Sequence, residues 1–329
     1  MRFRTSIPSA LHALAVFSIG VALSPTTFAQ SGAESYPDKP VRIIVPFAPG
    51  GSTDLIGRTL AQKMSETWNQ TVVVENRGGG ATIIGTEAAI KSKPDGYTLL
   101  IGVSTLATNP AMQPKLPYDT MRDLEPISMV ARAPIVAYIN PGFAPQDLKG
   151  LIAFAKSTAG GVHYGSGGTG TVTHLAAELL KDRTGAPLTH IVYKGGTPAM
   201  ADAIAGHIPM TFATVGQALQ HYRAKQLRAL GVTSAERYPS IPDVPTFKEQ
   251  GIDIVTSEWF ALFAPAGTPK PIIDKLNAEV RKIVALPNLA DRLTAIELVS
   301  SSPQELADFV RQETNQWGEL IRKVGLKGS

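Results

Sequence analysis

The sequence contains no cysteine in 329 residues. This absence excludes disulfide bridges, thiolate metal sites, cysteine nucleophiles and a lipid-modified N-terminal cysteine. Charge is also scarce, with 18% charged residues, a net charge of +4 and no dense run of Lys or Arg. So small and dispersed a charge argues against nucleic acid or an anionic membrane surface as partner. Hydrophobic residues make up 43% of the chain, so it can build a sizeable core, and its length suits two domains.

Long apolar runs are missing everywhere except near the N-terminus. There, Arg2 and Arg4 precede an apolar stretch at 11–23, and Thr27-Phe28-Ala29 offers a small-residue cleavage site. This order is typical of a secretory signal peptide, and the stretch is shorter than the about 20 residues of a membrane span. We therefore expect residues 1–29 to be removed after Ala29 and the mature chain to reside in the periplasm. An uncleaved anchor is the alternative that this length disfavours.

The remaining sequence alternates β-type and helix-type segments, which is typical of a mostly parallel sheet covered by helices. Apolar runs predict strands at 41–45, 72–75, 98–103, 135–139, 162–164, 188–193, 208–212, 227–233 and 260–263. Apolar spacing and end signals predict helices from about Leu55, at 86–91, at 148–156, after Thr171, from a Thr197 cap to Gly206, after Thr268-Pro269, and after a capping box at 302–305. The fold class is therefore α/β.

Two strand-to-helix turns are rich in glycine and hydroxyl residues: PGGSTD at 49–54 and GSGGTGT at 165–171. Glycine lets the backbone approach a ligand closely, and the first N–H groups of the following helix favour an anion such as a carboxylate. The hydroxyl donors at the same level are Ser52, Thr53, Ser166, Thr169 and Thr171. Helix capping alone would explain one such turn. Several of them at the carboxyl ends of strands favour ligand binding.

Motifs of catalysis and of cofactor binding fail in detail. Gly165, Gly167 and Gly170 fit G-x-G-x-x-G, but the acidic residue expected about 20 residues later is missing. Tyr164 stands where a nucleophile elbow around Ser166 requires glycine. The histidines of the mature chain, at 163, 174, 190, 207 and 221, have no zinc-site spacing. We therefore expect no enzyme activity, cofactor or metal. His174, near a helix start, is the one histidine placed to contact a ligand.

Two charged residues near these turns allow two interpretations each. Asp54 is stabilised by the dipole at its helix start, yet beside an anion site it would repel the ligand unless water or a ligand ammonium group intervened. Lys194, between Tyr193 and Gly195, either neutralises a second carboxylate or is solvated.

At these residues the chain resembles the Bug family, the extracytoplasmic solute receptors of tripartite tricarboxylate transporters. The resemblance covers essentially the whole mature chain. Its motifs are YPDKPV (36–41), VPFAPGGSTD (45–54), VENR (74–77), PDGYTLL (94–100), YGSG (164–167), HLA (174–176), YKG (193–195), RAL (228–230), PDVPT (242–246) and APAGTP (264–269).

The resemblance implies a periplasmic-binding-protein-like fold, in which two α/β lobes are joined by two crossing strands with a ligand cleft between them. It places lobe 1 at 30–134 and 260–329, with a last helix that can pack across, and lobe 2 at 135–259. The crossings are expected near 134–139 and 258–263. The implied first-lobe contacts are Phe47, Pro49, Gly50, Gly51, Ser52, Thr53 and Asp54, with the loop from Ser104 and Thr105 up to Asn109. The implied second-lobe contacts are Ser166, Gly168, Thr169, Thr171, His174, Tyr193, Lys194 and Thr214.

The expected function is capture of a small carboxylate or an amino acid and its delivery, by cleft closure, to the membrane permease of a tripartite tricarboxylate transporter. The expected partners are that ligand and that permease, with no nucleic acid, and the receptor is expected to be a monomer. A sensor that presents the same solute to a membrane kinase is the main alternative. A secreted hydrolase is a weaker one, and the signal peptide disfavours a regulator's effector domain.

Overall fold

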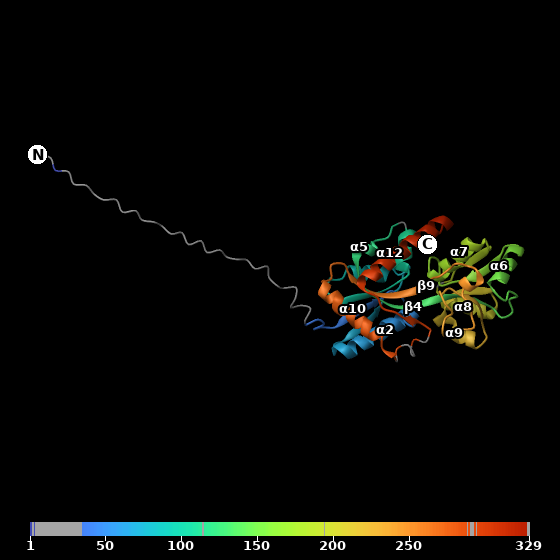
Figure 1. Cartoon of the computed structure of the whole chain (residues 1–329), viewed down its shortest axis with the longest axis horizontal. Coiled ribbons are helices and arrows are strands. Elements are labelled where there is room, and N and C mark those ends of the chain that lie inside the picture. The colour runs from blue at the N-terminus through green and yellow to red at the C-terminus, as the bar shows by residue number, and fades with distance from the viewer. Residues whose placement is uncertain are drawn as a thin grey trace.

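A computed structural model of the chain describes residues 1, 3, 35–113, 115–193, 195–287, 289, 293 and 295–327. The predicted cleavage site at Ala29 and the predicted site residue Lys194 lie outside these residues. Two α/β lobes lie side by side, and strands β4 (Leu124–Ile139) and β9 (Ser257–Pro265) lie where the lobes join (Figure 1). Within the described part, no helix combines the length and the apolar character needed to cross a membrane.

The first lobe is built on the strand order β2–β1–β3–β9–β4. Strand β1 (Val41–Val45) pairs in parallel with β2 (Val72–Asn76) and with β3 (Thr98–Val103), and β9 is antiparallel to β3. Alternate residues of β1 point to opposite cores because side chains alternate along a strand. Ile43 packs with α2 (Ser52–Trp68) and α10 (Lys270–Val284), whereas Ile44 belongs to a core shared with α4 (Thr105–Met112) and α12 (Pro303–Val324). Both faces of the sheet are therefore buried.

The second lobe repeats this arrangement with shorter strands. Strand β5 (Val162–Gly165) pairs in parallel with β6 (Leu188–Ile191) and β7 (Met210–Thr214), and both β7 and β8 (Arg228–Val232) pair antiparallel to β4. Its helices are α6 (Leu148–Ser157), α7 (Val172–Thr184), α8 (Gly196–Ala205) and α9 (Val215–Arg223). The short elements α3 (Ile83–Ile90), α5 (Thr120–Asp123), η1 (Lys248–Gln250) and β10 (Glu297–Leu298) complete the described structure.

The chain crosses between the two lobes at two points. Strand β4 pairs with β9 up to Pro134 and with β7 from Ile135 onward. The chain returns at Thr256, whose N–H donates to the Thr233 carbonyl, and from Ser257 it pairs with the first-lobe part of β4. The ranges 134–139 and 258–263, near which the sequence places the crossings, lie within β4 and β9.

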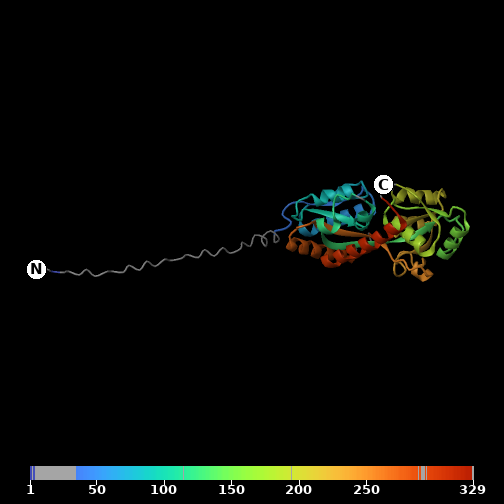
Figure 2. The ribbon, with the colours of Figure 1, turned by 90° about the horizontal axis from the view of Figure 1, so that it is seen from above.

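The last helix, α12, packs across both lobes. It begins at the predicted capping box of Ser302 and Glu305, which is confirmed. Most of α12 lies on α4 and β4, and its end reaches α7, where Lys323 forms an ion pair with Asp182 (Figures 1 and 2).

Three local predictions were wrong. The stretch from Ser104 to Asn109 was expected to be a loop, but Ser104 is the N-cap of α4 and the rest lies in this helix. Helix α4 contains Pro110, which has no N–H to donate to the Leu106 carbonyl; that carbonyl accepts a hydrogen bond from the Thr120 hydroxyl instead (2.9 Å). Strand β4 is longer than 135–139, because the register shift after Pro126 accommodates a proline that would otherwise end the strand. Helix α8 begins at Gly196 rather than after a Thr197 cap, although its predicted end at Gly206 is confirmed.

Candidate ligand-binding cleft

A cavity of about 350 Å³ lies between the two lobes, beyond the carboxyl ends of their parallel strands. The loops after β1, β3, β5 and β7 all contribute to its wall, as expected for ligand sites in α/β sheets. The lining residues are Phe47, Ala48, Gly51, Ser52, Thr53, Val103, Thr105, Gly167, Thr171, Thr173, Gly195, Gly196, Thr197, Thr214, Gln217, Glu258 and Phe260.

The first-lobe wall is the start of α2. Its N-cap is Gly51, which has no side chain to satisfy the first N–H groups of the helix. Ser52 and Thr53, whose amides belong to this first turn, line the cavity beside it. A Cβ atom added at Gly51 would meet nothing within 4 Å. The helix start therefore presents its amides and its positive dipole end to open space, which suits an anion.

Asp54 holds this turn from behind. Its carboxylate accepts hydrogen bonds from the Gly50 N–H (3.0 Å), the Arg58 guanidinium (2.9 Å) and the Asn76 amide (2.8 Å), and the Asn76 amide also reaches the Phe47 carbonyl. Burial raises the pKa of Asp54, but these hydrogen bonds outweigh it and leave the pKa below its ordinary value. Of the two interpretations that the sequence left open, the contacts favour a structural one, in which Asp54 shapes the turn outside the lining of the cavity.

The second-lobe wall is formed by the starts of three helices. Helix α8 begins like α2, with glycine as its N-cap, so Gly195 leaves its first amides without a side-chain cap. By contrast, Thr171 caps α7 and Thr214 caps α9, where Gln217 completes a capping box. Uncapped helix starts therefore face the cavity from both lobes, and only α7 and α9 have their first turns satisfied by the chain itself.

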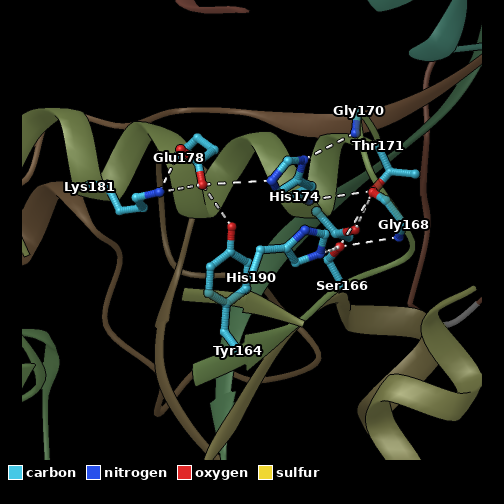
Figure 3. A network of polar contacts seen from close by, with 10 residues as sticks. Tyr164, Ser166, Gly168, Gly170, Thr171, His174, Glu178, Lys181 and His190 are labelled. Atoms are coloured by element: carbon cyan, nitrogen blue, oxygen red, sulfur yellow. Dashed lines mark hydrogen bonds and ion pairs between the residues drawn. The ribbon is translucent and has the colours of Figure 1, made fainter. Parts of the chain in front are cut away.

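A polar network behind the turn at 166–171 fixes its shape (Figure 3). The Gly168 N–H donates to the Ser166 hydroxyl (3.1 Å), which in turn contacts His190 Nε2 (2.8 Å). The Gly170 N–H donates to His174 Nδ1 (3.1 Å), so this nitrogen is unprotonated and the neutral ring carries its proton on Nε2.

The same network contains a buried carboxylate. Glu178 accepts hydrogen bonds from the Tyr164 hydroxyl (2.9 Å) and the Lys181 ammonium (2.8 Å), and His174 Nε2 lies 3.7 Å from it (Figure 3). The imidazoles of His174 and His190 stack with centroids 4.0 Å apart. Burial, with a contribution from His190, lowers the pKa of His174 to about 3, and burial also lowers the pKa of His190. At neutral pH both rings are neutral, and they support the turn without lining the cavity.

The floor of the cavity comes from β9. Glu258 and Phe260 lie on one side of this strand and line the cavity, and Glu258 Oε1 accepts a hydrogen bond from the Ser104 N–H (3.1 Å). Burial raises the pKa of Glu258, and hydrogen bonding from Ser104 offsets part of the rise. Sequence reasoning placed Glu258 only at a crossing. The sequence feature that could have identified it is an acidic residue on the same face of a buried strand as apolar residues such as Phe260, since side chains two residues apart in a strand share a face.

The structure brings part of the predicted site together. The predicted residues in the cavity wall are Phe47, Gly51, Ser52, Thr53, Thr105, Thr171 and Thr214. The predicted residues that the described lining does not include are Pro49, Gly50, Asp54, Ser104, Asn109, Ser166, Gly168, Thr169, His174 and Tyr193. Asn109 donates to the Ala81 carbonyl (2.9 Å), and the Tyr193 hydroxyl donates to Asp202 (2.7 Å). Sequence reasoning missed the roles of Gly195, Gly196, Gln217 and Glu258, which tertiary packing brings to the cavity.

Among the described residues, no group of three or more His, Cys, Asp or Glu side chains could hold a metal ion. The described lining of the cavity consists of backbone amides, hydroxyls, one amide side chain, one carboxyl group and apolar groups. These are groups that bind and orient a small molecule.

Two α/β lobes, two crossing strands and a cavity between them with both polar and apolar lining residues define a solute-binding protein of the periplasmic-binding-protein type. A family model described as "Tripartite tricarboxylate transporter family receptor" matches residues 56–326. The chain therefore belongs to this receptor family, which confirms the resemblance and the fold class predicted from the sequence.

Individual proteins show the same relationship. BugT of Bordetella pertussis is 37% identical over 319 residues, which cover 95% of this chain and 98% of BugT. The structure of "R. palustris Rpa4515 with adipate" is similar with a TM-score of 0.82 and 30% identity, covering 89% of this chain and all of that one. The structure of MatC from Rhodopseudomonas palustris with bound malate has a TM-score of 0.78 and 29% identity, covering 87% of this chain and all of that one. The family and these neighbours are solute-binding receptors rather than enzymes.

Proposed function

We propose that this receptor captures a small carboxylate in the periplasm and delivers it to the permease of a tripartite tricarboxylate transporter. The observation that carries the proposal is the pair of glycine-capped helix starts, α2 and α8, which face one cavity from opposite lobes. Helix starts of this kind favour anions. The bound malate and adipate of the two structural neighbours belong to the same chemical class.

Closure of the lobes supplies the mechanism. The chain switches lobes at Pro134/Ile135 and at Thr256/Ser257, so these two junctions are the proposed hinges between the lobes. A ligand that touches Ser52 on one lobe and Gly196 on the other makes all its contacts only when the lobes are closed. Its differential affinity then stabilises the closed state, which a permease can distinguish from the open one.

The signal peptide completes the proposal, with cleavage after Ala29 and release of the mature chain into the periplasm as a monomer. Mass spectrometry of the exported protein would give its N-terminus and its subunit mass. A mature chain that retained residues before Ala29 would contradict the cleavage site.

The ligand class is tested by two measurements on the mature protein. Native mass spectrometry after gentle purification identifies any retained ligand, and a melting-temperature screen compares mono-, di- and tricarboxylates and amino acids at equal concentration. At least one carboxylate should raise the melting temperature, because a ligand that binds the folded state stabilises it by mass action. If no carboxylate does so, and none is retained, the proposed ligand class is wrong.

A further inference from the structure

The cavity contains one ionisable side chain among its described lining residues, and that side chain is acidic. No Lys, Arg or His occurs among the lining residues. Glu258 accepts the Ser104 N–H, and no ion pair to it is formed by the described Lys and Arg residues. A partly buried carboxyl without a cationic partner is expensive when it is ionised.

Two charged residues on the elements around Glu258, Glu313 and Arg132, form no ion pair with it. Glu313 on α12 is also acidic and contributes to the raised pKa of Glu258, after the larger effect of burial. Arg132, on the neighbouring strand, lies over the Phe309 ring at 4.9 Å and lines a different cavity. The helix starts on the walls of the cleft therefore favour negative charge in the ligand, whereas the floor carries an acidic side chain that lacks a cationic partner among the described residues and would be stabilised in its ionised form by a cation.

A simple carboxylate does not match this arrangement. Its negative charge would be favourable at Gly51 and Gly196 but unfavourable near Glu258, because like charges within a few Å in a cavity repel strongly. A molecule with a carboxylate at one point and an ammonium group at another matches both features. The ammonium group would supply the counter-charge that none of the described Lys and Arg residues gives to Glu258.

We propose that Glu258 is the specificity determinant of the cleft and selects amino carboxylates, such as α-amino acids, over carboxylates of the same skeleton without the amino group. The ligand carboxylate contacts the amides at the starts of α2 and α8, and its ammonium group donates to the Glu258 carboxylate. This assignment rests on the proposed carboxylate-binding function and narrows it to one ligand class. Thr105 and Thr214, both in the lining, offer hydroxyl acceptors for the remaining ammonium protons.

The test uses matched pairs of probes that differ by one amino group: aspartate and succinate, glutamate and glutarate, alanine and propionate. Isothermal titration of the mature wild-type protein should give, in at least one pair, tighter binding of the amino member by about tenfold or more, the effect of one charge-assisted hydrogen bond. Glu258→Gln should remove most of this preference by weakening the amino member and strengthening the other. Glu236→Gln, at an exposed position outside the cavity, removes an equal charge and should leave the preference unchanged.

Two results separate this proposal from the proposed function. If succinate, glutarate or propionate binds wild-type protein at least as tightly as its amino partner, and Glu258→Gln does not change the ratio, the Glu258 assignment is wrong while carboxylate capture stands. If no probe of either kind binds, the carboxylate-binding function itself fails for these skeletons, and the assignment fails with it. Should Glu258→Gln not fold, Glu258→Asp, which keeps the charge but shortens its reach, should lower the preference in the same direction.

Discussion

Replacing Gly51 by valine should weaken ligand binding severely and leave the fold intact. The backbone at Gly51 has φ −86° and ψ 174°, an extended conformation that any residue adopts. An added Cβ meets no protein atom within 4 Å, so the side chain costs little in the empty protein. It would project into the cavity in front of the Ser52 and Thr53 amides, where the ligand anion must approach.

The magnitude follows from the bonds that are lost. A hydrogen bond from an amide to a charged group contributes about 1.5–3 kcal/mol, which corresponds to roughly 10- to 150-fold in affinity. Loss of both amide contacts should weaken binding by about 100-fold or more. Gly51→Ala projects less far and should have a smaller effect of the same sign.

The neighbouring glycine offers a contrast. Gly50 has φ +95°, a region that a residue with a Cβ adopts only at a cost of about 1–2 kcal/mol. Gly50→Ala should therefore lower the free energy of unfolding, whereas Gly51→Ala should not. Gly216→Ala is the control for adding a methyl group. Its Cβ would make an ordinary 3.5 Å contact with Ala295, Gly216 does not line the cavity, and it lies in α9, where alanine is favoured over glycine. This variant should therefore not lower the free energy of unfolding.

The assay combines isothermal titration, with the ligand that gives the largest shift in the melting-temperature screen, and urea denaturation of the same variants. Wild-type affinity in Gly51→Val would refute the assignment of the α2 start as the anion site. Lost affinity together with a large loss of stability would refute the argument that the cavity accommodates the side chain.

Three further predictions concern the residues that support the cleft. Burial and the neighbouring His190 lower the pKa of His174 to about 3 in the folded protein. As pH falls below about 6.5, the unfolded chain therefore binds a proton at this residue before the folded chain does, and the fold loses stability. In urea denaturation, His174→Asn should reduce this loss between pH 6.5 and 4 by up to about 1.4 kcal/mol per pH unit. The pKa of Asp54 is lowered in the folded state, because its hydrogen bonds outweigh the opposing effect of burial, so the ionised carboxylate stabilises the fold above the ordinary pKa. Asp54→Asn should lower the free energy of unfolding by about 1–3 kcal/mol at pH 7, and this difference from wild type should shrink below pH about 4. Thr214→Ala removes the cap of α9 and should cost about 0.5–2 kcal/mol, whereas Thr214→Ser should retain most of the wild-type stability.

Each of these predictions has a contradicting outcome. If the free energy of unfolding falls with pH between 6.5 and 4 as steeply in His174→Asn as in wild type, His174 gains its proton without destabilising the fold. A difference between Asp54→Asn and wild type that stays constant down to pH 3 would exclude an ionic contribution. Equal stabilities of Thr214→Ala and Thr214→Ser would show that the hydroxyl does not cap α9.

Much of the fold was predictable because local patterns agree with the tertiary structure. The apolar runs at 41–45 and 98–103 coincide with β1 and β3, and the capping box at Ser302 starts α12. The failures occur where packing overrides a local signal. Pro110 lies inside α4, on which α12 packs. Helix α8 begins at Gly196, one residue before the expected Thr197 cap.

The sequence by itself determined that glycine-rich turns would open helices at the carboxyl ends of parallel strands, because glycine conformation and helix-end chemistry are local properties. It also determined the family through ordered motifs along the chain. Only the tertiary structure decided which helix starts share a cavity, that α2 and α8 face each other while Asp54 and His174 lie behind the wall, and that Glu258 reaches the floor. These facts depend on strands β4 and β9, whose crossings bring residues that are far apart in the sequence to one cavity. A local sequence pattern does not determine which distant segments meet.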